Sequence, residues 1–321
     1  MSKDLSFKNK IRRLTIKLGI KKHLMPIYEI INKRKTKKAM SLYNAICTKY
    51  GLNETKRDVE VTVSFTTYPD RINSAVYVAD AMLRQTFKPD RIIMVLSSND
   101  YKSTVQLPKD FINLEKRGLT VVIIDEDLRS HNKYRYAMQN YSEGIIITVD
   151  DDILYPENLI EQLYESYKKY PTAISSARAH RIMFYGDKLL PYNDWIFEST
   201  YTFNPAFDLI ALGVSGVLYP PNCFEKKHEL LLDSKAVMEV SLYADDLWLK
   251  IIELLCSIPV VLAYQKPPDS LLIPSSQKTS LHIDNVDNNR NDTILRDSLK
   301  YLNINDNIFR EMTRFGTKEK V

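Results

Sequence analysis

Cysteine, glycine and long apolar runs are all scarce in this sequence, and each scarcity excludes a class of protein. The three cysteines, Cys47, Cys223 and Cys256, are far apart and lack metal-ligand spacing, which excludes a disulfide framework and a cysteine zinc site. The 8 glycines form no glycine-rich phosphate loop. No stretch approaches the ~18 uncharged apolar residues of a membrane-spanning helix, and no secretory signal is recognisable. We therefore expect a reduced protein of the cytoplasm.

The net charge of +5 is unevenly distributed. Residues 1–60 contain 16 Lys and Arg against 5 Asp and Glu, a net charge of +11, so the remainder holds 29 against 35, a net charge of −6. Ile11, Leu14 and Leu18 recur at helical spacing among the basic residues, as in helices that lie on anionic membranes. A solvated extension or a self-association arm would have the same composition. The segment lacks interleaved aromatic residues, so nucleic acid is not the expected partner.

From Val59 onward, short apolar strands alternate with longer amphipathic segments. This alternation is typical of an α/β domain with a mostly parallel central sheet and flanking helices, as in Rossmann-like folds. The periodicity predicts strands at 59–66, 91–96, 119–124, 145–149 and 173–177, and helices at 72–84, 134–140, 157–170 and 243–256.

The strand that ends near residue 149 is followed by three carboxylates, those of Asp150, Asp151 and Asp152. Ligands of open α/β sheets bind outside the C-terminal ends of the strands, and the second strand also ends in polar residues, beginning with Ser97. Like charges ~4 Å apart repel by about 4 kcal/mol at an effective dielectric near 20. A bound Mg²⁺ or Mn²⁺ would remove that repulsion, so we expect a divalent-cation site. The alternative is a solvated turn and helix cap.

Several separated motifs together resemble the glycosyltransferases of the A-type nucleotide-sugar fold, in particular the bacterial family-2-like enzymes of surface and capsular polysaccharide synthesis. The resemblance covers residues 59–295. It rests on the nucleotide loop at 61–70, the basic helix around 131–133, the metal motif at 148–155, the acceptor-side segment at 213–221 and the Glu-Asp motif at 244–248. The usual Glu of the last motif is Asp245 here, one methylene shorter.

The resemblance implies a role for each acidic residue. Asp246 would be the general base and Asp245 a supporting acceptor, although a one-residue shift of the helix would exchange them, and capping of that helix is the alternative. Asp152 would bind the metal directly. Asp150 would contact the ribose or reach the metal through water. Asp151 would support the side chains that contact the metal.

The remaining implied site residues contact the donor or complete the metal site. Thr67, Tyr68 and Asp70 would hold the nucleobase and ribose, with plain packing as the alternative for Tyr68, and Ser97 would also contact the donor. Lys133 would face the diphosphate, unless it is an ordinary surface lysine. His282 would complete the metal coordination, although a lone histidine commonly has no such role.

The implied activity is that of a metal-dependent, inverting glycosyltransferase that uses Mn²⁺ or Mg²⁺ and a nucleotide-sugar donor, of which UDP-sugar is the commonest case. The acceptor would be a hydroxyl of a glycan or a lipid-linked oligosaccharide in surface polysaccharide synthesis, reached from the inner face of the cell membrane. A metal-dependent nucleotidyl- or phosphotransferase and a non-catalytic scaffold of a polysaccharide assembly complex are the alternatives. Aromatic residues crowd 180–212 and form either a satellite core or a stacking platform for a sugar ring.

The expected domain organisation has four parts. Residues 1–58 form a basic helical extension, residues 59–155 a nucleotide-sugar half, residues 156–295 an acceptor half, and residues 296–321 a C-terminal tail. The sequence does not predict the oligomeric state.

Overall fold

A seven-stranded sheet forms the centre of the computed structural model, which describes residues 30, 33–43, 47–200, 204–264, 268, 271–273 and 290–318. The strand order is β12-β6-β11-β4-β1-β2-β3. The strands are β1 (Val61–Thr66), β2 (Arg91–Ser97), β3 (Leu119–Ile124), β4 (Ile145–Thr148), β6 (Ile174–Ser176), β11 (Val217–Tyr219) and β12 (Val260–Leu262). Strand β11 runs antiparallel to both of its neighbours, and every other pair in the sheet is parallel. The predicted fold class is confirmed.

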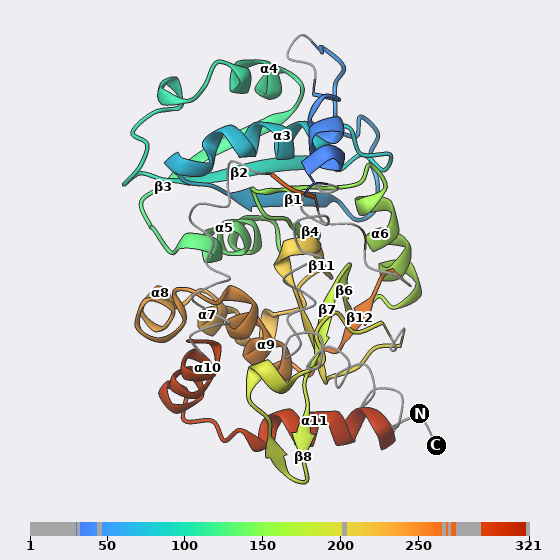
Figure 1. Cartoon of the computed structure of the whole chain (residues 1–321), viewed down its shortest axis with the longest axis vertical. Coiled ribbons are helices and arrows are strands. Elements are labelled where there is room, and N and C mark those ends of the chain that lie inside the picture. Colours follow the sequence, from blue (N-terminus) through green and yellow to red (C-terminus); the bar gives the residue numbers. More distant parts are fainter. Residues whose placement is uncertain are drawn as a thin grey trace.

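Helices cover both faces of this sheet (Figure 1). One face packs against α3 (Ile72–Leu83), α4 (Asp110–Lys116) and α6 (Leu159–Lys169). The other packs against α5 (Asn132–Tyr141), α7 (His228–Leu231), α8 (Ser234–Ala236) and α9 (Asp245–Leu255). In β4, Ile145 and Ile147 enter the first core and Ile146 enters the second. A strand buried on both faces has no polar side, which explains the uninterrupted apolar run before the aspartates.

The strands and helices predicted from periodicity are present, with small shifts at their ends. The first strand begins at Val61 instead of residue 59, and the strand expected at 173–177 is limited to β6. The small-residue segment from residue 213 forms a 3-10 turn, Gly213–Ser215, and then β11.

Within the described part of the aromatic segment at 180–212, most of the aromatic side chains form a satellite core, and Tyr185 is exposed. The segment contains the short strands β7 (Ala179–Arg181), β8 (Phe184–Tyr185), β9 (Lys188–Leu189) and β10 (Leu209–Ala211). Tyr192 and Trp195 are buried with their ring centroids 4.8 Å apart, in a cluster that includes Ile251 of α9. Trp195 Nε1 donates to the carbonyl of Leu190 at 2.8 Å, so its polar end is also satisfied inside the protein. These two rings therefore offer no stacking face to a ligand.

Two helices near the C-terminus were not predicted. They are α10 (Arg290–Tyr301), which begins before the expected boundary at residue 295, and α11 (Asn307–Lys318). Leu295 of α10 and Phe309 of α11 are buried in the same cluster as Ile251 of α9. Both helices thus pack against the helix that carries the second acidic pair.

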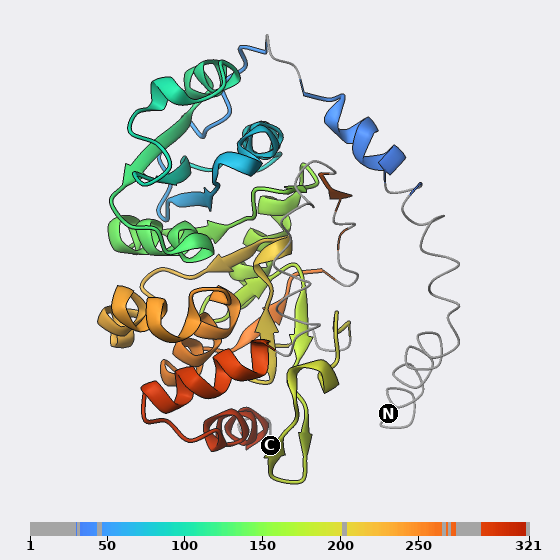
Figure 2. The same cartoon turned by 60° about the vertical axis from the view of Figure 1, so that its left-hand side comes forward.

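Part of the basic N-terminal segment packs onto the domain. Residues 33–40 are helical, and residues 1–29 of the expected extension lie outside the described residues. Thr36 is buried and its Oγ1 donates to the carbonyl of Leu272 in β13 (Leu271–Leu272) at 3.3 Å. Strand β13 pairs with β5 (Ile153–Leu154), directly after the aspartate triplet. Figure 2 shows the helix and β13 on the same side of the domain. Within the described ranges, no helix has the length and apolar character needed to cross a membrane.

Candidate active site at the sheet edge

The aspartate triplet lies where parallel strands end together. Strands β4, β1 and β2 are neighbours with the same direction, so the residues after β4 lie beside those that follow β1 and β2. The turn after β4 is fixed by Tyr155, whose hydroxyl accepts from the backbone N–H of Asp150 at 2.8 Å and donates to the carbonyl of Val214 at 3.2 Å. The triplet is thereby fixed to the small-residue segment that precedes β11.

Arg71 is a site residue that the sequence analysis missed. Its Nη1 lies 3.1 Å from Asp151 Oδ1 and 3.0 Å from Asp152 Oδ2. Its guanidinium carbon lies 5.5 Å from the ring centroid of Tyr68, which is half-buried. The only signal in the sequence is a positive residue in the loop after β1, a loop that faces three carboxylates in this fold.

Lys133 joins the triplet to the second acidic pair. Its Nζ lies 2.7 Å from Asp150 Oδ1 and 2.8 Å from Asp245 Oδ2. Lys133 is only 3% exposed, so it is not a surface lysine. Burial alone lowers the pKa of Lys133, but Asp150 and Asp245 together raise it well above its ordinary value, so the ammonium stays charged. Two acidic clusters that are far apart in the sequence thus share one cation.

The two aspartates at the start of α9 have different environments. Burial opposes charge on Asp245, but Lys133 and His131 lower the pKa of Asp245 to about 2. Burial and the neighbouring charge of Asp245 hold the pKa of Asp246 well above its ordinary value. Asp246 Oδ1 accepts the backbone N–H of Gly213 at 3.0 Å. Environments that push two titratable groups apart are typical of sites with acid and base roles.

Gly213 allows the backbone to approach this cluster closely. A Cβ atom at this position would lie 2.7 Å from Lys133 Nζ and 3.2 Å from Asp246 Oδ1. Any larger residue would push against both groups. Crowding by Lys133 and Asp246 therefore explains why this segment has a small residue at position 213.

His131 is a buried residue that orders the segment before the acidic pair of α9. It is fully buried, with Nε2 2.8 Å from the carbonyl of Ser241 and Nδ1 2.9 Å from the hydroxyl of Tyr134. Burial lowers the pKa of His131 to about 4, so the ring is neutral near pH 7. A neutral ring with this geometry donates from Nε2 to Ser241 and accepts from Tyr134, which holds the turn before α9 in place.

The cluster contains more negative than positive side chains. Arg71 and Lys133 face five aspartates, those of the triplet and of α9. Burial and the charge of Asp150 raise the pKa of Asp152 to about 7. Asp151 Oδ2 is buried without a hydrogen-bond partner in the described part of the chain. These are hard oxygen ligands with surplus negative charge, which fits a divalent cation of the Mg²⁺ or Mn²⁺ type.

A complete metal-binding cage is not formed by the described residues alone. Among them, no group of three or more His, Cys, Asp or Glu side chains is arranged to hold a metal ion. His282, the expected additional ligand, lies outside the described residues. Mg²⁺ is usually held by one or two carboxylates together with substrate phosphates, so a cation at the triplet would need further ligands from a bound diphosphate.

The expected donor-contacting residues other than Lys133 and the triplet lie at the ends of β1 and β2. Thr67 and Ser97 are buried, Tyr68 is half-buried and Asp70 is exposed. Ser97 Oγ accepts the backbone N–H of Asn99 at 3.1 Å, which orders the turn after β2. All four therefore lie on the strand-end edge on which the triplet lies.

One protein-family model matches the central part of the chain. Residues 74–214 match the model of glycosyl transferase family 2. The matched region contains Lys133, the triplet and Gly213; it stops before Asp245 and begins after Arg71. The prediction that the chain is a glycosyltransferase is confirmed by this match.

Two further searches complete the comparison. No curated protein matches the sequence. Among solved structures, the chain is similar to the mannosyltransferase PcManGT from Pyrobaculum calidifontis in complex with GDP-Man and Mn²⁺, with 14% sequence identity and a TM-score of 0.47, over 89% of this chain and 78% of that one.

Proposed function

We propose that this glycosyltransferase moves a sugar from a nucleotide-diphosphate donor to an acceptor hydroxyl, with inversion at the anomeric carbon. The observation that carries the proposal is the position of Lys133, whose single ammonium contacts both Asp150 and Asp245. A donor diphosphate at the triplet and an acceptor beside α9 would then meet within one polar cluster. Thr67, Tyr68, Asp70 and Ser97 line the edge on which the nucleoside would lie.

The acceptor hydroxyl is activated by Asp246 in this proposal. Its oxygen attacks the anomeric carbon while the bond from that carbon to the diphosphate oxygen breaks, and its proton passes to the Asp246 carboxylate. The raised pKa of Asp246 makes it the better proton acceptor of the pair. Asp245 has a pKa of about 2 and stays ionised beside Lys133, so it orients the cluster instead of taking the proton.

The leaving diphosphate requires positive charge at the triplet. Asp152, with Asp150, would hold a divalent cation, which would act as a Lewis acid on the departing oxygens. Lys133 adds a fixed positive charge next to Asp150 in a water-poor site, where such charges stabilise developing negative charge effectively. Asp151 accepts a hydrogen bond from Arg71 Nη1 at 3.1 Å, which partly offsets its negative charge.

A direct test is donor turnover over a panel of nucleotide sugars with Mn²⁺, with the released nucleoside diphosphate as readout. We expect turnover with one donor class and a loss of about 10²-fold or more in Asp152→Asn, because the leaving group loses its electrostatic support. Asp297→Asn, an exposed aspartate of α10, is the matched control and should keep wild-type rates. Released pyrophosphate would instead indicate nucleotidyl transfer. Absence of turnover with every donor would favour a non-catalytic scaffold.

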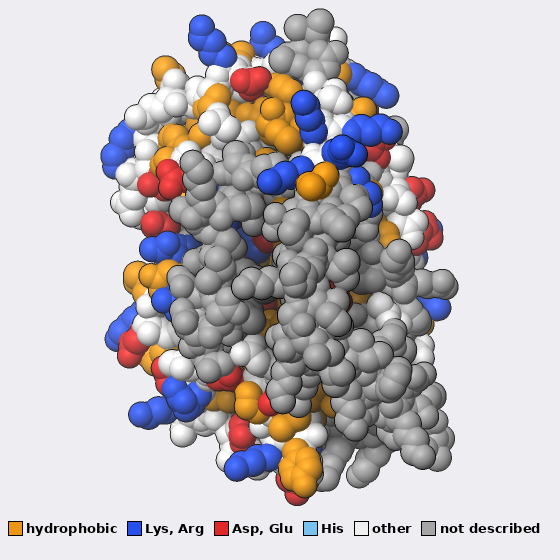
Figure 3. All heavy atoms as spheres, in the orientation of Figure 1, with side chains coloured by type: hydrophobic (Ala, Val, Ile, Leu, Met, Phe, Trp, Pro, Cys, Tyr) orange, Lys and Arg blue, Asp and Glu red, His pale blue; other side chains and the backbone are white. Residues whose placement is uncertain are grey.

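We also propose that the acceptor is a glycan or lipid-linked oligosaccharide of surface polysaccharide synthesis and that the helix of residues 33–40 contacts an anionic membrane. Its exposed basic side chains are Lys33, Arg34, Lys35, Lys37 and Lys38. Ile30 and Leu42 beside it are 53% and 58% exposed. Figure 3 shows Lys and Arg side chains gathered in the upper part of the view, where this helix lies in Figure 1. Through β13, this surface adjoins the residues after the triplet.

Vesicle binding tests the membrane contact. Each basic residue near an anionic surface contributes roughly 1 kcal/mol, so replacing the five of the 33–40 helix by Ser should weaken binding to phosphatidylglycerol vesicles by about 10³- to 10⁴-fold. The matched control replaces five exposed lysines elsewhere, Lys168, Lys169, Lys226, Lys227 and Lys235. Binding that persists in the first variant, or that occurs equally on neutral phosphatidylcholine vesicles, would contradict this contact.

A further inference from the structure

Arg71 holds the same carboxylates that the proposed divalent cation requires. We infer that Arg71 is the protein's own counter-ion for Asp151 and Asp152, that a divalent cation displaces it from these oxygens, and that Arg71 thereby sets the affinity of the site for the cation. This inference rests on the proposed function, because it concerns how the same site acquires its cation.

The contact geometry makes arginine and cation competitors. A single nitrogen, Nη1, lies between Asp151 Oδ1 at 3.1 Å and Asp152 Oδ2 at 3.0 Å. A cation bound to Asp152 through this oxygen would lie next to the positive charge of the guanidinium, and the repulsion between the two favours displacement of Arg71. The side chain of Arg71 is 14% exposed, so both contacts are largely shielded from water and from salt. Displacing Arg71 therefore has a cost, and that cost lowers the apparent affinity for the cation.

The two cations of the cluster have different freedom. Lys133 is 3% exposed and lies between Asp150 and Asp245, where it joins two elements of the fold. Among the described residues, the side chain of Arg71 pairs with Asp151 and Asp152 and lies over the ring of Tyr68, from the short 3-10 helix between β1 and α3. Lys133 is thus built into the scaffold, whereas Arg71 can leave its carboxylates without separating the two halves of the site.

A displaced Arg71 would remain useful to the donor. Its Nε is buried and has no hydrogen-bond partner among the described residues. A guanidinium presents a planar fork of donors that matches phosphate oxygens. With Asp151 and Asp152 occupied by a cation, the guanidinium of Arg71 would be free to pair with a bound diphosphate. Arg71 would then be a positioning residue that couples cation binding to donor binding.

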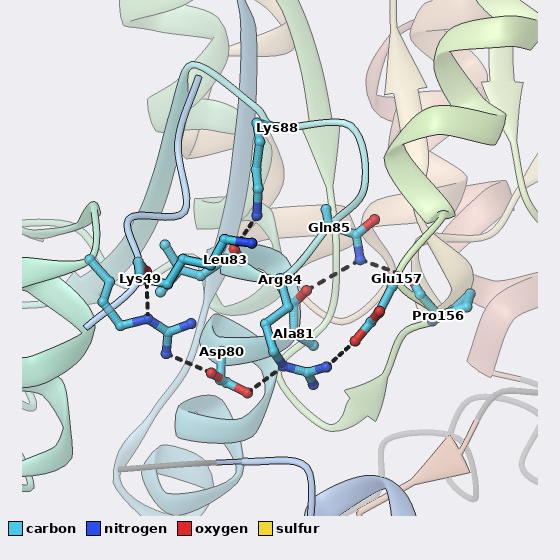
Figure 4. A network of polar contacts seen from close by, with 10 residues as sticks. Lys49, Asp80, Ala81, Leu83, Arg84, Gln85, Lys88, Pro156 and Glu157 are labelled. Carbon is cyan, nitrogen blue, oxygen red and sulfur yellow. Dashed lines mark hydrogen bonds and ion pairs between the residues drawn. The ribbon is translucent and has the colours of Figure 1, made fainter. Parts of the chain in front are cut away.

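The test is the affinity for Mn²⁺ alone, measured as free Mn²⁺ by electron paramagnetic resonance. Arg71→Gln removes the competing charge, and we expect Mn²⁺ to bind about tenfold more tightly or more. The matched control is Arg84→Gln at the opposite end of the same helix, α3. Arg84 likewise bridges two carboxylates, those of Asp80 and Glu157 (Figure 4), but away from the triplet. The Arg84→Gln variant should leave the Mn²⁺ affinity unchanged.

Arg71→Lys is the second variant, for the case that Arg71→Gln does not fold. An ammonium keeps the charge but not the fork, so we expect tighter Mn²⁺ binding than wild type by a smaller factor. In both variants the KM for the donor should rise, because the diphosphate loses its guanidinium partner. Unchanged or weaker Mn²⁺ affinity in the variants would overturn the inference, even if the wild type turns over a nucleotide sugar. Tighter Mn²⁺ binding without turnover of any donor would support the inference and reject the proposed function.

Discussion

Asp246→Asn is expected to lower kcat by 10²–10⁴-fold while donor binding stays unchanged, because positioned general bases contribute about that factor. The asparagine keeps an oxygen that can accept the Gly213 N–H, now 3.0 Å from Asp246 Oδ1, so the local backbone should be preserved. It cannot accept a proton from the acceptor hydroxyl. Rates with saturating donor and acceptor measure the effect. Glu239→Gln, at an exposed residue of the short π-helix Val237–Ser241 that precedes α9, is the control and should retain wild-type kcat.

The same variant should also change the pH dependence of kcat. Burial and the charge of Asp245 hold the pKa of Asp246 well above its ordinary value. Only the deprotonated carboxylate can accept a proton, so kcat of the wild type should rise with pH as Asp246 loses its proton. The residual rate of Asp246→Asn should lack this acidic limb. An identical limb in both proteins would assign it to another group and would contradict the role of Asp246 as base.

Asp80→Asn is expected to lower the free energy of unfolding by about 3–5 kcal/mol, the usual effect of removing one partner from a buried ion pair. Asp80 and Arg117 are 2% and 1% exposed, and Asp80 Oδ1 lies 2.6 Å from Arg117 Nη1. Asp80 Oδ2 also accepts from Arg84 Nε at 2.8 Å (Figure 4). Without the carboxylate, the guanidinium of Arg117 would remain buried with no counter-charge. Denaturant unfolding of the two proteins measures the difference.

The double variant Asp80→Leu with Arg117→Met tests the physical reason. Hydrophobic replacement of both partners removes the buried charges together, so it should recover most of the stability lost in Asp80→Asn. If the double variant were no more stable than the single one, the loss would come from the shape of the side chains and not from the unpaired charge. This network holds the C-terminal end of α3 in place. Arg71 lies directly before the N-terminal end of the same helix.

The sequence predicted those features that depend on local pattern. Strands β1 to β4 are short segments rich in apolar and β-branched residues, so they and the edge at which they end were visible in the sequence. The triplet lies at that edge because it directly follows β4. The second acidic pair lies close to it, as the resemblance implied, and Lys133 is the residue that joins them.

Features that depend on distant partners were not predictable in this way. Arg71 and Asp151 are 80 positions apart, and no periodicity indicates that a loop arginine turns toward a carboxylate after another strand. The antiparallel direction of β11 is set by the path of the chain through the satellite core, not by its own three residues. Likewise, α10 and α11 are stabilised by packing on α9, a contact that their amphipathic pattern does not identify.

Calorimetric titration of the chosen nucleotide sugar into three proteins, with and without Mn²⁺, tests the central claim most directly. The account predicts Mn²⁺-dependent binding to the wild type and to Asp246→Asn, although the latter does not turn the donor over, and loss of that binding in Asp152→Asn. Equal donor affinity in Asp152→Asn and the wild type, or wild-type turnover by Asp246→Asn, would contradict it.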